Sequence, residues 1–167
     1  FIGRPVYRLE LGSPTEVHLV PDMIPPDAGL VALRVPDTWP GPEPSAGFRE
    51  IETLVQLQRR LTREDAGNAP GDTRFSTPED AATCAAIASA AFSADRYHAD
   101  PMIAEHIAAR IKAAWARNEV CGRADRTFVC ERNGKVAGFN GCLLTDGVMT
   151  IDLIAVSPEH QGKGIGK

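Results

Sequence analysis

The segment from residue 126 to residue 156 constrains the fold most, because it alternates strand-forming stretches with tight turns. Three stretches rich in β-branched, aromatic and other apolar residues follow one another: "RTFVCE" (126–131), "KVAGFNGCLL" (135–144) and "VMTIDLIAV" (148–156). Asn133-Gly134 separates the first two, and this dipeptide favours the turn of a two-residue hairpin. "TDG" (145–147) provides a second turn. The sequence therefore predicts a three-stranded antiparallel meander.

Two helices are predicted before the meander. In "STPEDAATCAAIASAAF" (76–92), Thr77 is a helix N-cap, Pro78 fits the first helical position and Asp80 stands three residues after the cap. "ADPMIAEHIAARIKAAWARN" (99–118) repeats this pattern with Asp100-Pro101, and an apolar stripe follows at Ile103, Ile107, Ile111 and Trp115. Two helices followed by a meander predict an α/β fold of the α+β kind, a mixed, mostly antiparallel sheet flanked by helices.

The first 66 residues are predicted to form a small strand-rich segment before this domain. "PVYRLEL" (5–11) and "LVALRVP" (30–36) have strand character, and the prolines in residues 18–29 predict irregular chain. Residues 48–61 are also predicted as a strand, because apolar and polar positions alternate through Ile51, Thr53, Val55 and Leu57. The predicted organisation is a segment 1–66, a polar, Gly/Pro-rich linker 67–71 and a domain 72–167.

Composition and charge argue against several classes of function. The chain is 43% apolar and 24% charged, which is typical of a globular protein. Its net charge of −4 is spread without a long single-sign block, so we expect neither nucleic acid nor a membrane as a partner. No apolar run reaches the length of a membrane span and no secretory signal opens the chain, so we expect a cytoplasmic protein.

The cysteines point to a reducing compartment and away from a metal site. No CxxC pair occurs, and no histidine stands at zinc-ligand spacing from any of Cys84, Cys121, Cys130 and Cys142. We predict that all four are buried or half-buried thiols and that the protein binds no metal.

A glycine-rich segment, "EHQGKGIGK" (159–167), follows the last predicted strand. Its glycines, at positions 162, 164 and 166, can adopt a positive φ and admit a ligand close to the backbone. Such a run can turn successive N–H groups toward one point and so bind an anion. We predict that a phosphate or pyrophosphate group binds there.

Three phosphate-binding patterns compete for this segment. The dinucleotide fingerprint G-x-G-x-x-G would place its third glycine at Lys167 and needs a βαβ context. The P-loop pattern is one residue too long for this spacing. The third pattern, Q/R-x-x-G-x-G/A after a strand that ends in an apolar pair, fits Gln161, Gly164 and Gly166.

The stretch "LIAVSPEHQGKGIGK" (153–167) resembles the acetyl-coenzyme A binding motif of the GNAT superfamily of N-acetyltransferases. The order of two helices, a meander and a glycine-rich loop across residues 72–167 is similar to that family's. The resemblance implies acetyl-CoA as co-substrate and transfer of its acetyl group to a primary amine of a small molecule. It assigns the pyrophosphate to the backbone of the loop, comprising Gln161, Gly162, Lys163, Gly164, Ile165, Gly166 and Lys167.

The same resemblance assigns the rest of the co-substrate to the strand before the loop. It implies that the open edge of this strand pairs with the pantetheine arm, through Leu153, Ile154, Ala155 and Val156. It also implies a bulge in this strand, and a backbone N–H near Ile154 or Ala155 that polarises the acetyl carbonyl.

Asp152 is the nearest candidate for the catalytic base that removes the amine proton. It lies two residues before Ile154, so we expect both side chains on one face of the strand. The alternative is a solvated or structurally paired aspartate. For the acceptor amine, the connection between the two helices offers Arg96, Tyr97 and His98, against the alternative of a plain polar connection.

The other two histidines considered, His106 and His160, are expected at the surface. The family often places a tyrosine on a later helix as the acid that protonates the thiolate, but Tyr7 and Tyr97 both precede the loop. We therefore expect the chain to be the N-terminal half of a GNAT domain. The remaining helices and strands would follow Lys167 or come from another chain.

A narrower resemblance concerns the acceptor. "AGFREIETLVQLQRRL" (46–61), "AAFSADRYHADP" (90–101) and a helix containing Trp115 are similar to the TDP-fucosamine acetyltransferase group, which implies an amine on a nucleotide-linked sugar. The N-terminal segment would then extend the core sheet or form the surface of a homodimer. The alternative function is a non-catalytic GNAT-like module that binds coenzyme A or a partner protein.

Overall fold

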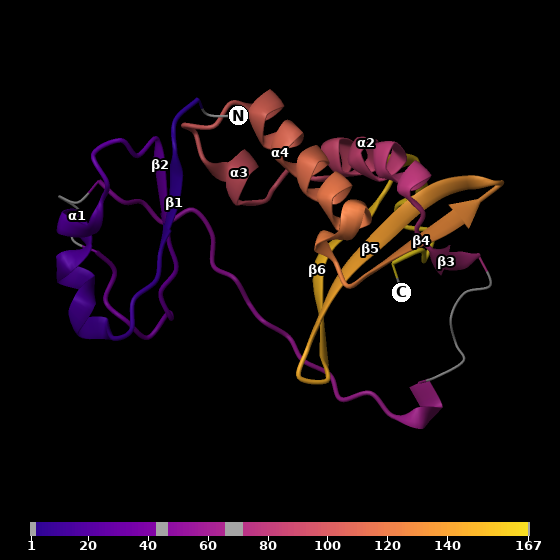
Figure 1. Ribbon diagram of the computed structural model, residues 1–167, viewed down its shortest axis with the longest axis horizontal. Helices are drawn as coiled ribbons and strands as arrows, with labels where there is room; N and C mark the ends of the chain where they lie inside the picture. Colours follow the sequence, from indigo (N-terminus) through magenta and orange to yellow (C-terminus); the bar gives the residue numbers. More distant parts are fainter. Residues whose placement is uncertain (1–2, 43–46, 66–71, 167) are drawn as a thin grey trace. The chain divides into compact units, whose positions relative to one another are not determined.

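The structure is a computed structural model that describes residues 3–42, 47–65 and 72–166. The chain divides into two compact units, residues 1–55 and 56–167 (Figure 1). The predicted linker, residues 67–71, lies outside the described residues, as does Lys167.

The first unit contains two short parallel strands and a helical segment. Strand β1 (Val6–Leu9) pairs with β2 (Leu30–Leu33) over their whole length. Between them, the 3₁₀ helix η1 (Pro14–Leu19) and α1 (Val20–Met23) occupy part of the region predicted to be irregular. Pro14 and Pro21 are compatible with helix because they stand in first turns, where a backbone N–H has no intrahelical partner.

The predicted strand over residues 48–61 is wrong. The chain there is irregular and leads into the short 3₁₀ helix η3 (Arg63–Asp65). The side chains of Leu54, Val55 and Leu57 are exposed, by 62%, 74% and 89%. An alternating pattern stabilises a strand only when a neighbouring strand completes the hydrogen-bond ladder, and no described strand pairs with this segment.

The second unit is built on a four-stranded antiparallel sheet in the order β3-β4-β5-β6 (Figure 1). Strands β4 (Arg126–Arg132), β5 (Lys135–Thr145) and β6 (Val148–Val156) confirm the predicted meander. Both turns have a positive φ at two consecutive residues, 53° and 70° at Asn133-Gly134 and 50° and 76° at Asp146-Gly147. Strand β3 (Thr73–Phe75) was not predicted, because three residues are too few for a pattern.

The first predicted helix is confirmed. A 3₁₀ turn, η4 (Pro78–Asp80), leads into α2 (Ala81–Ala91). Thr77 and Asp80 form the reciprocal hydrogen bonds of a capping box, as their spacing predicts.

The second predicted helix begins later than expected. Asp100 does not start it; its side chain instead accepts a hydrogen bond from the N–H of Met102, 2.9 Å away. A separate short helix, α3 (Arg96–Ala99), precedes it and is capped by Asp95. The long helix, α4 (Glu105–Asn118), ends at the predicted residue and continues into a π-helical turn, η5 (Glu119–Arg123).

The buried side of α4 is shifted by one residue from the predicted apolar stripe. Ile103, Ile107, Ile111 and Trp115 are only half-buried, and the fully buried line is Ala108, Lys112 and Ala116. The Lys112 ammonium lies 4.4 Å from the centre of the Phe92 ring, 4.9 Å from that of Trp115 and 3.6 Å from Asp95 Oδ1. Cation–π and ionic contacts therefore stabilise this buried charge.

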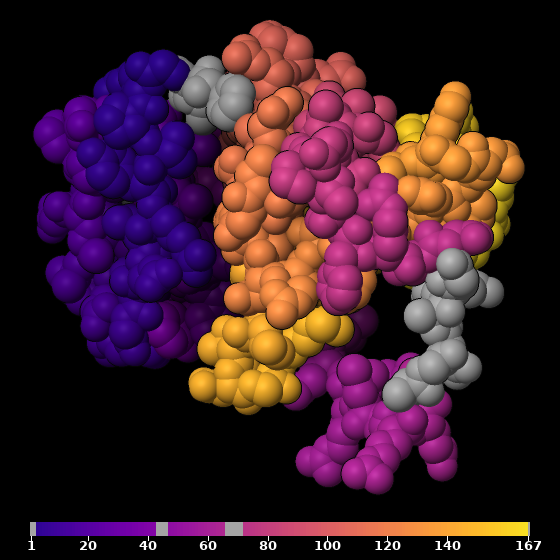
Figure 2. Space-filling view, turned by 45° about the vertical axis from the view of Figure 1, so that its right-hand side comes forward, coloured from indigo at the N-terminus to yellow at the C-terminus, as the bar shows by residue number. Residues whose placement is uncertain are grey.

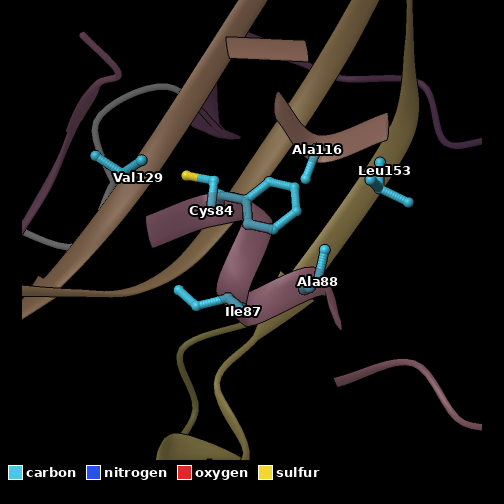
Figure 3. Close-up of a cluster of buried hydrophobic side chains, with 8 residues drawn as sticks. Cys84, Ile87, Ala88, Ala116, Val129 and Leu153 are labelled. Atoms are coloured by element: carbon cyan, nitrogen blue, oxygen red, sulfur yellow. The ribbon is translucent and has the colours of Figure 1, made fainter. Parts of the chain in front are cut away.

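The core lies between the sheet and the two long helices. Helix α2 packs against α4 and against β5 and β6, and the two helices lie side by side over one face of the unit (Figure 2). Cys84, Ile87 and Ala88 of α2 meet Ala116 of α4 and side chains of the sheet, including Val129 and Leu153 (Figure 3). This arrangement confirms the predicted class, an α/β fold with an antiparallel sheet flanked by helices.

The cysteines agree with the prediction in three cases of four. All are free thiols; Cys84, Cys130 and Cys142 are buried, whereas Cys121 is exposed, which corrects the prediction for that residue. Burial raises the pKa of Cys84 to about 12, so this thiol stays protonated and serves as a small apolar side chain.

Asp80→Ala is expected to lower the free energy of unfolding by about 2 kcal/mol at neutral pH. Asp80 accepts two hydrogen bonds from Arg74, at 2.7 and 3.0 Å, and one from the N–H of Thr77, at 2.7 Å. The Arg74 hydrogen bonds, more than any other factor, lower the pKa of Asp80. The stabilisation that Asp80 gives to the folded state is therefore complete at pH values above the pKa that Asp80 has in the unfolded chain. It is lost as the pH falls through the lower pKa that Asp80 has in the folded state.

Urea denaturation at several pH values measures this effect. The difference between the wild type and Asp80→Ala should shrink in acid. Glu105→Ala, which removes an exposed acid from the first turn of α4, is the control and should cost less than half as much. An equal cost for the two substitutions would contradict the account of Asp80.

Candidate active site

Strand β6 carries a β-bulge at Asp152. Leu153 stands opposite Gly141 and Ile151 opposite Cys142, so Asp152 has no opposite residue in β5. The extra residue breaks the alternation of the strand. Asp152 contacts α4 and η5, and Leu153 points into the core beneath the helices, whereas Ile154 is 40% exposed.

The expectation that Asp152 and Ile154 share one face of the strand is therefore wrong. A spacing of two residues keeps side chains on one face only in a regular strand, and the bulge lies at Asp152 itself. Asp152 instead faces the helix layer.

Two carboxyl groups meet at this bulge and share the same donors. Trp115 Nε1 donates to Asp152 Oδ2, 2.8 Å away, and lies 3.2 Å from Glu119 Oε1. The guanidinium of Arg123 donates to the same two oxygens. The site thus contains two acids and one cation, joined by an indole N–H.

The surroundings shift the pKa values of the two acids in opposite directions. Burial alone would raise the pKa of Asp152, but hydrogen bonds from Arg123 and Trp115 outweigh it and hold this pKa below its usual value. For Glu119, burial first and a hydrogen bond with Asp152 second raise the pKa. Asp152 is therefore the acid that carries the negative charge at neutral pH.

Sequence reasoning missed Glu119. It lies one residue beyond the end of the helix predicted over residues 99–118. The spacing contained a signal, because Glu119 stands four residues after Trp115 and four before Arg123, the separation at which side chains meet on a continuing helical turn.

The glycine-rich loop leaves β6 through the 3₁₀ helix η6 (Pro158–His160) and folds back on its own start. Gln161 Nε2 donates to the carbonyl oxygen of Val156 at 3.1 Å. Lys163 Nζ donates to the carbonyl oxygen of Glu159 at 2.8 Å. These side chains fix the shape of the loop from within, which leaves the backbone to face a ligand.

The loop has the features of an anion-binding backbone. Gly162 and Gly164 have φ of +74° and +79°, which side chains disfavour, and a Cβ at either would meet no described atom within 4 Å. None of the N–H groups of residues 162–166 donates a hydrogen bond to a described residue. Open space and unpaired donors fit a phosphate or diphosphate group.

Strand β6 offers an edge beside this loop. From Leu153 to Val156 it pairs with β5 on one side, and in the part of the chain that the structure describes no strand pairs with its other side. An unpaired edge of this kind can bind an extended ligand through backbone hydrogen bonds.

The three acceptor candidates lie together on α3, and the side chain of one of them is largely shielded from solvent. Only 6% of the His98 side chain is exposed, and its Nδ1 lies 2.7 Å from Asp95 Oδ2. Arg96 donates to the Tyr97 hydroxyl at 3.0 Å. His98 is therefore held inside the fold, while Arg96 and Tyr97 are half-buried.

The α3 residues are linked to the bulge through side-chain contacts. The Lys112 ammonium lies 5.5 Å from the centre of the Tyr97 ring and 4.9 Å from that of Trp115. Trp115 in turn donates to Asp152. Of the two histidines expected at the surface, His106 is exposed, whereas His160 is half-buried, with Nδ1 2.8 Å from Ser157 Oγ.

No metal site appears among residues 3–42, 47–65 and 72–166, where no three His, Cys, Asp or Glu side chains are grouped to hold an ion. Among the described helices, none combines the length and apolar character needed to cross a membrane.

Comparison with known proteins identifies the family. Residues 84–167, half of the chain, match the acetyltransferase (GNAT) family, and the chain belongs to this family. It is also similar to the spore coat polysaccharide biosynthesis protein SpsD of Bacillus subtilis (strain 168), with 35% identity over 88 residues. The matched segment is 53% of this chain but spans only 30% of that relative's length.

Proposed function

We propose that this protein is an acetyl-CoA-dependent N-acetyltransferase that acts on the primary amine of a small molecule. The observation that carries the proposal is the loop of residues 162–166, whose backbone N–H groups have no partner among the described residues and whose glycines at positions 162 and 164 border open space. Membership of the acetyltransferase family supports the reaction type.

The chain's own residues would bind the co-substrate in two places. The N–H groups between Gly162 and Gly166 would hold the diphosphate, with Gln161 and Lys163 fixing the loop. The unpaired edge from Leu153 to Val156 would align the pantetheine arm, and the N–H of Ile154 or Ala155 would stabilise negative charge on the carbonyl oxygen. Bound acetyl-CoA supplies the activated acetyl thioester.

Asp152 is the proposed base of the reaction. An amine attacks only when it is neutral, so its proton must pass to an acceptor. Asp152 is ionised at neutral pH, and both of its donors bind Oδ2, which leaves Oδ1 available to accept the proton directly or through water. Trp115 and Arg123 would hold the carboxylate in this orientation.

An amino-sugar nucleotide is the proposed acceptor. The resemblance of residues 46–61 and 90–101 to the TDP-fucosamine acetyltransferase group supports it. The similarity to a protein of spore coat polysaccharide biosynthesis also supports a sugar-linked amine.

The test is a comparison of acceptors with the full-length protein and acetyl-CoA, with thiol release as the readout. The acceptors are a nucleotide-linked amino sugar, the same amino sugar without the nucleotide, and a peptide with a free N-terminus. We expect kcat/KM to be at least about 100-fold higher for the nucleotide-linked amine than for the free sugar. Preference for the peptide would contradict the small-molecule acceptor, and coenzyme A binding without thiol release for any amine would favour the non-catalytic module.

A further inference from the structure

We propose that Glu119 is a positioning residue for Asp152: it keeps its proton in the resting protein and donates a hydrogen bond that fixes the Asp152 carboxylate at the bulge of β6. This inference rests on the proposed function, because it assigns Glu119 its role through the proposed base. The evidence is the burial of Glu119, the balance of charges around it and the glycine that admits its carboxyl group.

The burial of Glu119 favours a neutral carboxyl group. Its side chain is 0% exposed, and Oε2 has no hydrogen-bond partner among the residues that the structure describes. An ionised carboxylate with one unpaired buried oxygen would lose its hydration without compensation. A neutral carboxyl group loses much less, and a proton on Oε1, the oxygen that shares its donors with Asp152 Oδ2, would supply a hydrogen bond to that oxygen.

The charges around Glu119 also favour one proton on the pair. The groups that act on it are Arg123 on its own segment, Asp152 on β6 and the thiol of Cys142 on β5. One guanidinium can neutralise one carboxylate, and two carboxylates sharing donors would repel each other. Asp152, with 17% of its side chain exposed, is the better hydrated of the two and takes the charge.

The burial and the hydrogen bond with Asp152 that raise the pKa of Glu119 agree with this division. Burial raises the pKa of Cys142, so this thiol remains neutral and adds no charge.

A glycine in β5 makes room for the Glu119 carboxyl group. A Cβ added at Gly141 would collide with Glu119 Oε2 and would lie 3.1 Å from its Cδ. Gly141 stands opposite Leu153, beside the bulged Asp152. The Glu119 carboxyl group thus packs directly on the backbone of β5, at the point where the bulge changes the register between β5 and β6. In this position it can support the side chain of Asp152.

The proposed role consumes no proton. Glu119 donates to Asp152 together with Trp115 and Arg123, which lowers the pKa of Asp152 and fixes its rotation. The proton that Asp152 accepts during the reaction comes from the acceptor amine, and Glu119 keeps its own.

The first test does not depend on activity. The full-length protein, labelled with ¹³C at the glutamate carboxyl carbons, is observed by NMR between pH 5 and pH 8. At pH 7, which is well above the ordinary glutamate pKa of about 4.3, we expect one glutamate signal to remain at the position of a protonated carboxyl group. This signal should be missing from the spectrum of Glu119→Gln. If every glutamate signal of the wild type is that of a carboxylate at pH 7, the proposal is wrong, whatever the protein acetylates.

The second test separates positioning from bulk. Glu119→Gln keeps an uncharged donor of similar size, whereas Glu119→Leu keeps the volume and removes the donor. We expect Glu119→Gln to retain kcat within about threefold and to keep the wild-type acid limb, the fall of kcat/KM toward low pH. We expect Glu119→Leu to lose kcat at least about tenfold, with its acid limb about one pH unit higher than that of the wild type. Circular dichroism restricts the comparison to pH values at which each variant is folded.

Two results of the second test would overturn the proposal. An acid limb that moves downward in Glu119→Gln would mean that the wild-type residue is ionised. Equal losses in both variants, with unchanged pH profiles, would mean that Glu119 only fills space. Failure of acetyl transfer in the wild type would count against the proposed function alone, because the NMR result would still decide the state of Glu119.

Discussion

Replacing Gly164 by glutamate is expected to abolish coenzyme A binding. The backbone at this position has a φ of +79°, and the space above it is open. A glutamate there would strain the loop by about 1 kcal/mol and place a side chain and a negative charge where the diphosphate is proposed to bind. We expect an affinity loss of at least about 100-fold, which corresponds to about 2.8 kcal/mol.

Thermal unfolding of the full-length protein measures this loss. A ligand at 100 times its Kd stabilises the folded state by about 2.7 kcal/mol, so coenzyme A should raise the Tm of the wild type by several degrees. Gly164→Glu should show no increase at the same concentration.

The matched control is Gly147→Glu, at the turn between β5 and β6. Gly147 also has a positive φ, +76°, and no described atom within 4 Å of an added Cβ, so the substitution introduces the same strain and charge elsewhere. This variant should lose stability but keep the full coenzyme A shift. An undiminished shift in Gly164→Glu, or the same loss in both variants, would contradict the assignment of the loop.

Asp152→Asn is expected to lower kcat at least about 100-fold, the usual contribution of a positioned base. Asparagine keeps the size of the side chain and an oxygen for Trp115 and Arg123, but its amide cannot accept the amine proton. Coenzyme A affinity should stay within about threefold, because the side chain faces the helix layer and not the loop. Steady-state kinetics and the thermal shift together separate these two effects.

The pH dependence adds a second readout for Asp152. Because hydrogen bonds hold its pKa below the usual value, protonation of Asp152 should lower kcat only at pH values below the ordinary aspartate range, apart from any loss caused by protonation of the acceptor amine itself. Asp146→Asn, in the exposed turn at the far end of β6, is the control and should keep wild-type kinetics. Asp152→Asn with more than about a third of the wild-type kcat would mean that Asp152 has only a structural role.

The parts of the fold predicted correctly from the sequence depend on local chemistry. Asn133-Gly134 and Asp146-Gly147 determine their turns through backbone preferences that need no distant partner, so the meander follows from the sequence. The Thr77–Asp80 capping box is equally local. The segment 48–61 failed because a strand depends on a neighbour that its sequence does not specify.

The candidate site was predicted only as far as it is local. The positive φ values at Gly162 and Gly164 follow from residue type, and they support the loop assignment. The direction of Asp152 depends on how β6 pairs with β5, and the burial of Glu119 depends on the packing of η5 over Gly141. Neither can be derived from a periodic pattern in one segment.

A crystal structure of the full-length protein with coenzyme A would show whether the backbone of residues 162–166 binds the diphosphate. We expect diphosphate oxygens about 3 Å from several of these backbone nitrogens, with the pantetheine arm along the edge from Leu153 to Val156. A diphosphate bound elsewhere, or loop N–H groups directed away from it, would contradict the account.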